Sequence, residues 1–131
     1  MQSSDIQLRI DVPFQYPIVF EDGVFAGSKS ELSRFLNREA ERRTHRCLVF
    51  IDEGVAAHHP RLASLVEVFF SAPDLTAELA HPPLVLPGGE ACKNNFDTAL
   101  KVIRLARHVH LDRHSYVIAV GGGALLDAVG F

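Results

Sequence analysis

Glycines and carboxylates gather at three points of this sequence, each directly after an apolar run. The three clusters are Asp52-Glu53-Gly54, Gly88-Gly89-Glu90 and Gly121-Gly122-Gly123. Glycine has no Cβ, so the backbone can turn sharply and come close to a ligand. Carboxylates accept hydrogen bonds from ribose hydroxyls, and the N–H groups at a helix start bind phosphates. These residue types therefore favour a ligand with sugar and phosphate groups.

The glycine triplet is the clearest signal for an anion. It follows an apolar run and opens a segment with helical spacing, so the free N–H groups of the helix start could face a pyrophosphate. The usual GxGxxG spacing of dinucleotide sites is absent, and three glycines can also make a simple tight turn. Asp127 lies one turn further on and could accept hydrogen bonds from a ribose or an amide. Alternatively, Asp127 is an ordinary carboxylate favoured by the helix dipole.

The other two clusters allow similar alternatives. Asp52 could accept hydrogen bonds from two ribose hydroxyls, or it could cap the turn that follows it. Glu90 and Lys93 are three residues apart, so a helix would place both on one side, next to Gly89. Together they could hold hydroxyl groups and a phosphate, or they could form an exposed ion pair that contributes little.

The remaining chemistry-bearing residues form no metal or nucleophile motif. The sequence has seven histidines, but His58 and His59 are adjacent, and His108 and His110 are two apart. Neither pair has the i, i+4 spacing that lets two helical histidines reach one ion. HExxH and GxSxG motifs are also absent. We therefore predict no metal ligand and no catalytic residue in this chain.

Alternating strands and helices must position the three clusters. Continuous apolar runs predict buried strands over residues 47–51, 84–86 and 116–120. Helical spacing predicts helices over 29–43, 60–72 and 95–110, the first with a capping box from Ser28 to Glu31. At the N-terminus, Ile6–Val12 and Ile18–Phe20 are expected to pair as a β-ribbon. The fold class is therefore α/β, Rossmann-like, with a mostly parallel sheet whose strand ends bring the clusters together.

Composition limits the partners of the chain. The 131 residues fit one domain, and 47% apolar with 22% charged residues excludes a disordered tail. A net charge of −3 gives no basic field for nucleic acid or for an anionic membrane, and it suits a small-molecule partner without requiring one. Two cysteines are too few for a disulfide scaffold, and neither a signal peptide nor a membrane-length apolar run is present, so we expect a cytoplasmic protein.

Two motifs together resemble the 3-dehydroquinate synthases and the wider sugar-phosphate cyclases. The first is PGGEACKN over residues 87–94, and the second, after a helix, is AVGGGALLDAVGF over residues 119–131. The resemblance implies that residues 1–131 are the N-terminal NAD-binding domain of a two-domain enzyme. The chain ends in apolar sequence within an expected helix, which also indicates a fragment.

The resemblance also implies roles for individual residues. Asp52 matches the acidic residue that holds the adenosine ribose, and Asp127 matches the acidic residue near the nicotinamide half. Glu90 and Lys93 match the pair near the riboses of the cofactor, and Gly122, Gly123 and Ala124 match the pyrophosphate loop. Gly89, in the first motif, is also expected to bind the cofactor. Gly54 stands where the family usually has Asn, and Leu126 where it usually has Gly, which favours a divergent cyclase.

The implied activity belongs to the complete enzyme. A cyclase of this family is a metal-dependent lyase of the shikimate-pathway type, which oxidises its sugar phosphate transiently with NAD, eliminates phosphate, reduces the product and closes a ring by an aldol step. Its zinc or cobalt ligands lie in a C-terminal helical domain, so this segment alone is expected to be inactive. Family members can be homodimers. The alternatives are a domain of an iron-dependent alcohol or glycerol dehydrogenase, or a stand-alone nucleotide-binding regulatory module.

Overall fold

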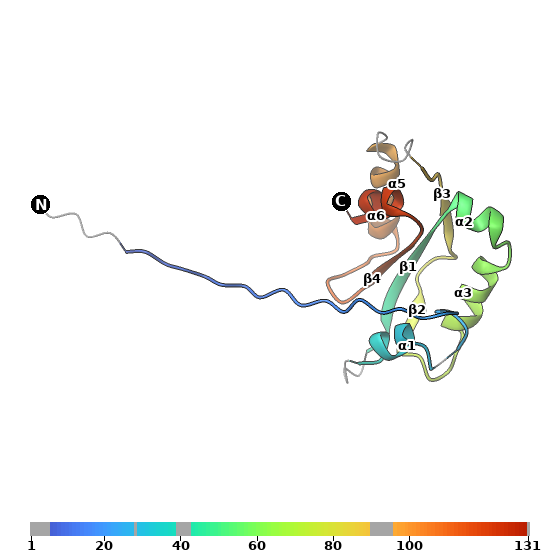
Figure 1. Ribbon diagram of the computed structural model, residues 1–131, viewed down its shortest axis with the longest axis horizontal. Helices are drawn as coiled ribbons and strands as arrows, with labels where there is room; N and C mark the ends of the chain where they lie inside the picture. Colours follow the sequence, from blue (N-terminus) through green and yellow to red (C-terminus); the bar gives the residue numbers. More distant parts are fainter. Residues whose placement is uncertain (1–5, 28, 39–42, 90–95, 131) are drawn as a thin grey trace, which may run out of the picture.

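The domain is an open α/β sheet with helices on both faces (Figure 1). The computed structural model describes residues 6–27, 29–38, 43–89 and 96–130. Four parallel strands, β1 (His45–Asp52), β2 (Ala77–Leu79), β3 (Leu84–Leu86) and β4 (Tyr116–Val120), form the sheet. The helices are α1 (Glu31–Leu36), α2 (Glu53–His58), α3 (Leu62–Phe70), α5 (Phe96–His108) and α6 (Gly123–Gly130). The predicted α/β, Rossmann-like fold with a parallel sheet is confirmed.

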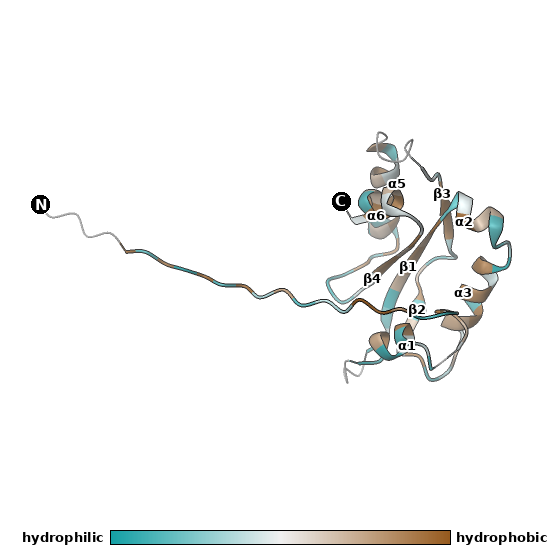
Figure 2. Ribbon diagram, in the orientation of Figure 1, coloured by the Kyte–Doolittle hydropathy of each residue, from teal (hydrophilic) through white to brown (hydrophobic). Residues whose placement is uncertain are grey.

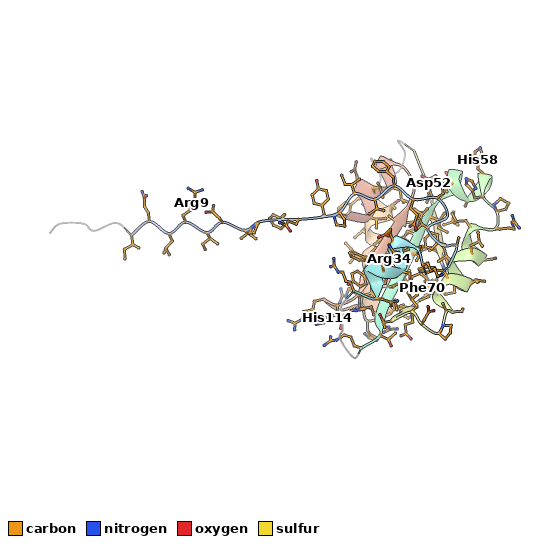
Figure 3. All side chains as sticks on the ribbon, turned by 60° about the horizontal axis from the view of Figure 1, so that its bottom comes forward. Arg9, Arg34, Asp52, His58, Phe70 and His114 are labelled. Atoms are coloured by element: carbon orange, nitrogen blue, oxygen red, sulfur yellow. The ribbon has the colours of Figure 1, made fainter. Side chains whose placement is uncertain are left out.

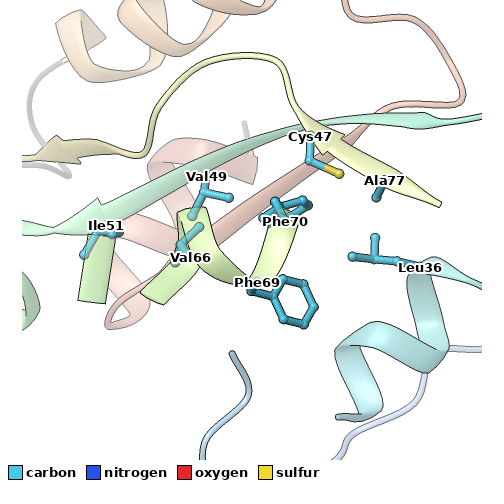
Figure 4. Packing of buried hydrophobic residues seen from close by; sticks show 8 residues of the cluster. All are labelled: Leu36, Cys47, Val49, Ile51, Val66, Phe69, Phe70 and Ala77. Carbon is cyan, nitrogen blue, oxygen red and sulfur yellow. The ribbon is translucent and has the colours of Figure 1, made fainter. Parts of the chain in front are cut away.

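Strand β1 is the centre of the fold because both of its faces are covered. Cys47, Val49 and Ile51 face a cluster with α1 and α3, shown in Figure 4. Leu48 and Phe50 face a second cluster with α5 and α6. Side chains alternate between the faces of a strand, so a continuous apolar run is what a strand between two helical layers requires. Figure 2 shows this apolar centre along the strands.

Two elements were not predicted from the sequence. Helix α2 begins directly after β1 and has six residues, and β2 has only three residues. Strand β2 pairs with the start of β1, from His45 opposite Ala77 to Cys47 opposite Leu79. Elements this short give no periodic pattern that the sequence could display.

The first predicted helix is shorter than expected and has a different cap. Helix α1 begins at Glu31, and the Ser30 hydroxyl accepts the N–H of Ser33 at 3.2 Å, so the Ser28–Glu31 capping box is wrong. Ser28 itself lies outside the described residues. The helix ends at Leu36, and Oδ1 of its C-cap residue, Asn37, accepts the N–H of Thr76 at 2.8 Å.

The predicted N-terminal β-ribbon is also wrong. Residues 6–20 are exposed and have no strand pairing within the described chain, and Figure 1 shows them running away from the domain. Two short strands gain little stability from pairing only with each other. The chain turns back only at Gly23, whose φ is +68° and whose carbonyl accepts the N–H of Ala26 at 2.7 Å.

The buried thiol of Cys47 gives a test of this packing. Burial raises the pKa of Cys47 from about 9.0 to about 12, so the native thiol stays protonated at neutral pH. A thiol reacts as its thiolate, so iodoacetamide at pH 8 should alkylate Cys47 only after unfolding in urea. A Cys92→Ser variant leaves Cys47 as the single thiol to be followed by mass spectrometry. Rapid alkylation of the native variant would contradict the packing around β1.

The same shift predicts how stability depends on alkaline pH. The pKa of Cys47 is higher in the folded chain than its ordinary value, so its contribution is complete below about pH 9. As the pH rises from 9 towards 12, the unfolded chain loses the thiol proton first, and the free energy of unfolding should fall. Urea unfolding at several pH values measures this slope, and Cys47→Ala should flatten it.

Candidate functional site

The order of the strands marks one place in the sheet where a ligand is expected. Strand β1 has β2 and β3 on one side and β4 on the other, since Phe50 is paired with both Leu84 and Ala119. The chain therefore adds β2 and β3 along one edge of β1, at its start and at its end, and then crosses over to add β4 along the opposite edge (Figure 1). In open α/β sheets, ligands bind beyond the carboxyl ends of the strands at such a reversal.

Asp52 lies at this reversal. It is the last residue of β1 and the N-cap of α2, with its Oδ1 accepting the N–H of Gly54 at 2.8 Å and of Val55 at 3.4 Å. Asp52 therefore has the capping role that was one of its two predicted alternatives. Figure 3 shows Asp52 at the same end of the molecule as His58, on the helix that follows. The cap fixes the position of the carboxylate at the strand end.

Gly88 and Gly121 lie against this carboxylate, and neither was among the predicted cofactor-binding residues. An added Cβ at Gly88 would lie 2.1 Å from Oδ2 of Asp52, and one at Gly121 would lie 2.8 Å from Cβ of Asp52. The register explains both contacts, because Ile51 is opposite Val120 and Asp52 is opposite Leu86. The only sequence signal for this role was the presence of glycine shortly after each strand. The three predicted clusters therefore do meet at one point.

The remaining glycines of the triplet lie on the open side of this point. Gly122 accepts the N–H groups of Leu125 and Leu126 through its carbonyl, both at 3.1 Å, so it starts α6. An added Cβ at Gly122 or Gly123 would have no atom within 4 Å. Their φ angles are also not in the left-handed region. Neither backbone conformation nor packing within the described residues therefore requires glycine at these two positions.

The other predicted cofactor residues fall into two groups. Ala124 is partly buried against the α5 and α6 side of the sheet, and Asp127 is exposed on α6. Gly89 has a φ of +71°, a conformation that favours glycine, with open space where its Cβ would be. Glu90 and Lys93 lie outside the described residues, so their predicted contacts stay predictions.

Glu53 also connects two sides of the site, although no role was predicted for its side chain. Its Oε1 accepts the N–H of Gly88 at 3.4 Å, which links the start of α2 to the segment after β3.

Within the described part of the chain, no three His, Cys, Asp or Glu side chains lie close enough to hold a metal ion. No described helix is long and apolar enough to cross a membrane.

Comparisons with known proteins show which family this sequence resembles. Residues 83–131, which contain β3, the segment after it, β4 and the glycine triplet, match the family model of the 3-dehydroquinate synthase N-terminal domain. The chain is similar to the 3-dehydroquinate synthases. The resemblance carried by the two motifs is thereby confirmed.

Individual synthases extend the similarity over most of the chain. The chain is 33% identical to the 3-dehydroquinate synthase of Rhodospirillum rubrum over 118 residues, which covers 88% of this chain and 26% of that protein. It is 28% identical to the Rhizobium meliloti synthase over 134 aligned positions, covering 100% of this chain and 31% of the relative. For Geobacillus thermodenitrificans the identity is 32%, over 89% of this chain and 29% of the synthase.

The chain thus spans between about a quarter and a third of these synthases. No solved structure matches this chain with comparable significance. The fold described above therefore stands on the chain's own strand pairing and packing.

Proposed function

We propose that this domain binds NAD as the N-terminal half of a 3-dehydroquinate synthase-like cyclase. The observation that carries the proposal is the pair Gly122 and Gly123, which nothing in the described chain requires to be glycine. A ligand that approaches the backbone does require it, because a Cβ would hold the ligand away from the N–H groups of the helix start. The pyrophosphate of a dinucleotide fits such a cradle.

The neighbouring carboxylates suit the rest of the cofactor. Asp52 stands at the end of β1, where an acidic residue accepts hydrogen bonds from a ribose in many dinucleotide sites. Asp127 on α6 is assigned to the nicotinamide half, and Glu90 and Lys93 to the riboses. NAD supplies hydride transfer when bound, and the residues of this chain orient it.

In the complete enzyme the proposed reaction acts on a sugar phosphate of the 3-deoxy-arabino-heptulosonate 7-phosphate type. Transient oxidation, phosphate elimination, reduction and an intramolecular aldol closure give a carbocycle. No described residue of this chain is assigned to the zinc or cobalt ion that the resemblance implies, because the described residues contain no suitable ligand cluster. The relatives reported above are all named as synthases, which favours this proposal over an iron-dependent dehydrogenase domain.

Calorimetric titration of the chain with NAD tests the proposal. We expect weak binding, since only one half of the enzyme's site is present, and no turnover of a sugar phosphate. Asp127→Ala should weaken NAD binding about 10-fold to 100-fold, the range for losing a hydrogen bond to a charged group. Asp74→Ala, the same change at a residue that follows α3 rather than β4, should leave NAD affinity unchanged. No heat with NAD, or equal affinities for all three proteins, would refute the assignment.

A further inference from the structure

Basic side chains gather around one hollow that the proposed function does not use, although the net charge of the chain is −3. The hollow has a volume of about 340 Å³ and lies between the start of β3 and the second half of α5. None of the described residues that line it is acidic, and most of them are Lys, Arg or His: His81, Leu84, Lys101, Arg104, Leu105 and His108. We call this site the basic hollow.

Helix α5 forms one wall of the basic hollow with a single face. Lys101, Arg104 and His108 follow one another at spacings of three and four residues, which places them on the same side of a helix. Leu105, four residues after Lys101, is the apolar residue of this wall. Val102 on the neighbouring face of the helix is buried in the core. The core packing of α5 therefore fixes the position of the basic face.

The segment before β3 forms the other wall. Nδ1 of His81 lies 2.7 Å from the carbonyl oxygen of Pro82. A carbonyl can only accept a hydrogen bond, so Nδ1 carries a proton and donates it. This hydrogen bond fixes the orientation of the imidazole ring beside the hollow.

The basic hollow has an apolar floor and a basic rim. Leu84 and Leu105 are partly buried and pack against the core cluster on the α5 and α6 side of the sheet. Lys101 and Arg104 are exposed, so their charged ends stand beside this apolar surface. Long basic side chains keep the charge in water while their stems cover apolar surface. A matching ligand therefore needs an apolar body and an anionic group.

The positive charges of the rim have no acidic partner within the described parts of the chain. The ion pairs of the structure involve other residues, and neither Lys101 nor Arg104 takes part in one. Like charges three or four residues apart on a helix repel each other. The helix dipole favours cations only in the last turn, and Lys101 lies before the last turn of α5. An anion between these side chains would remove the repulsion.

The basic hollow is separate from the proposed NAD site. Strand β3 ends at Leu86, which is opposite Asp52 at the strand reversal, whereas His81 precedes the first residue of β3. Figure 1 shows α5 starting at the end of the sheet where β3 ends and leading back towards the start of β4. His108, at the end of α5, is therefore the residue of this helix furthest from the reversal. The hollow lies before β3, and the proposed NAD site lies after it.

We propose that the basic hollow binds a phosphate monoester that carries one apolar ring. The permanent charges of Lys101 and Arg104 match a phosphate group, which has about −1.5 to −2 charges at pH 7. The guanidinium of Arg104 can donate two parallel hydrogen bonds to phosphate oxygens. The ring lies on Leu84 and Leu105. A volume of about 340 Å³ is near the lower end of the roughly 300–1,000 Å³ typical of ligand sites, so it suits one ring and not a dinucleotide.

Titration of the full chain with small probes, followed by NMR of its amide groups, tests the proposal. Phenyl phosphate combines the apolar ring with the phosphate. We expect it to bind at one site and to shift the amide signals of His81, Leu84 and residues 101–108. Glucose 6-phosphate keeps the charge without the apolar ring, and benzyl alcohol keeps the ring without the charge. Each should bind at least about tenfold more weakly than phenyl phosphate.

Two results of the titrations would overturn the proposal. One is a phenyl phosphate titration that does not saturate, or that shifts signals elsewhere in the chain. The other is equal affinity for phenyl phosphate and glucose 6-phosphate, which would show that the apolar floor has no role. Displacement of phenyl phosphate by NAD would also contradict it, because the probe would then lie at the strand reversal.

Variants of the basic rim locate the bound phosphate. Lys101→Gln and Arg104→Gln should each weaken phenyl phosphate binding about 10-fold to 100-fold, because each removes a charge-assisted hydrogen bond. Arg107→Gln makes the same change on the same helix at a position that does not line the hollow, so its affinity should match that of the unchanged chain. All three side chains are exposed, so the variants should stay folded, as circular dichroism can verify. An equal loss in Arg107→Gln would reveal a general effect of charge and refute the assigned site.

Discussion

Gly88→Ala should destabilise the domain by about 2–4 kcal/mol, although the added methyl group is small. An alanine Cβ at this position would lie 2.1 Å from Oδ2 and 2.6 Å from Cγ of Asp52. The carboxylate must therefore move, and overpacking of this kind costs about 1–3 kcal/mol. Movement also breaks the cap of α2, in which Asp52 accepts the N–H of Gly54, and a lost N-cap costs about 0.5–2 kcal/mol. A loss of this size is a large part of the about 5–15 kcal/mol that holds a typical domain folded.

A double-mutant cycle shows whether Asp52 is the cause. Asp52→Ala removes Cγ and both oxygens, so Gly88→Ala should cost almost nothing in that background. Gly122→Ala is the matched control, since an added Cβ there has no atom within 4 Å. Urea unfolding followed by circular dichroism gives the four free energies of unfolding. If the two substitutions were simply additive, the contact between the segment after β3 and the end of β1 would be wrong.

The central strands could be predicted because a continuous apolar run of this length is best explained by a strand that is buried on both faces. The apolar run of β1 cannot lie on a surface, and both faces of the strand are covered in the structure. The run over residues 84–86 and the run over 116–120 gave β3 and β4 with the same bounds. Because parallel strands end at one edge, the convergence of the three clusters followed from the fold class alone.

Helix α5 shows what periodicity cannot decide. Phe96, Leu100, Ile103 and Ala106 recur at helical spacing, which predicts that they form the inward face. In the structure Phe96 is 59% and Ile103 is 44% exposed. Thr98, Ala99 and Val102 are buried instead. Apolar residues cover a broad side of this helix, and helical spacing does not say which flank of that side meets the sheet. Packing against neighbouring elements makes that choice.

The pairing of residues 6–20 was predicted wrongly, and the contacts of two glycines with Asp52 were not predicted, for a related reason. Alternation in residues 6–20 predicts an extended chain, but the identity of its partner strand is not a local property. The approach of Gly88 and Gly121 to Asp52 depends on the register between strands distant in sequence. In both cases the residue types were informative, and the missing knowledge was which segment lies opposite.

Gly123→Val should abolish most NAD binding while leaving the domain as stable as before. Apart from its chain neighbours and the backbone of its own helix, no atom of the described residues lies within 4 Å of an added Cβ at Gly123, so this Cβ enters open space at the helix start. That space is where the proposed pyrophosphate would contact the N–H groups. We expect NAD affinity to fall at least about tenfold, which corresponds to roughly 1.4 kcal/mol of binding free energy. Gly123→Ala should give a smaller loss in the same direction.

Gly130→Val is the matched control because it makes the same change on the same helix, at the end away from the proposed NAD site. Gly123 and Gly130 are the first and last residues of α6, and a Cβ at either has no atom within 4 Å. Both substitutions alter helix propensity by similar small amounts, so both proteins should unfold at nearly the same urea concentration. Only the position at the start of the helix lies at the strand reversal, so only Gly123→Val should lose the heat of NAD binding. A glycine that served merely as a tight turn would instead show its loss in the unfolding curve, with NAD affinity unchanged among the chains that remain folded.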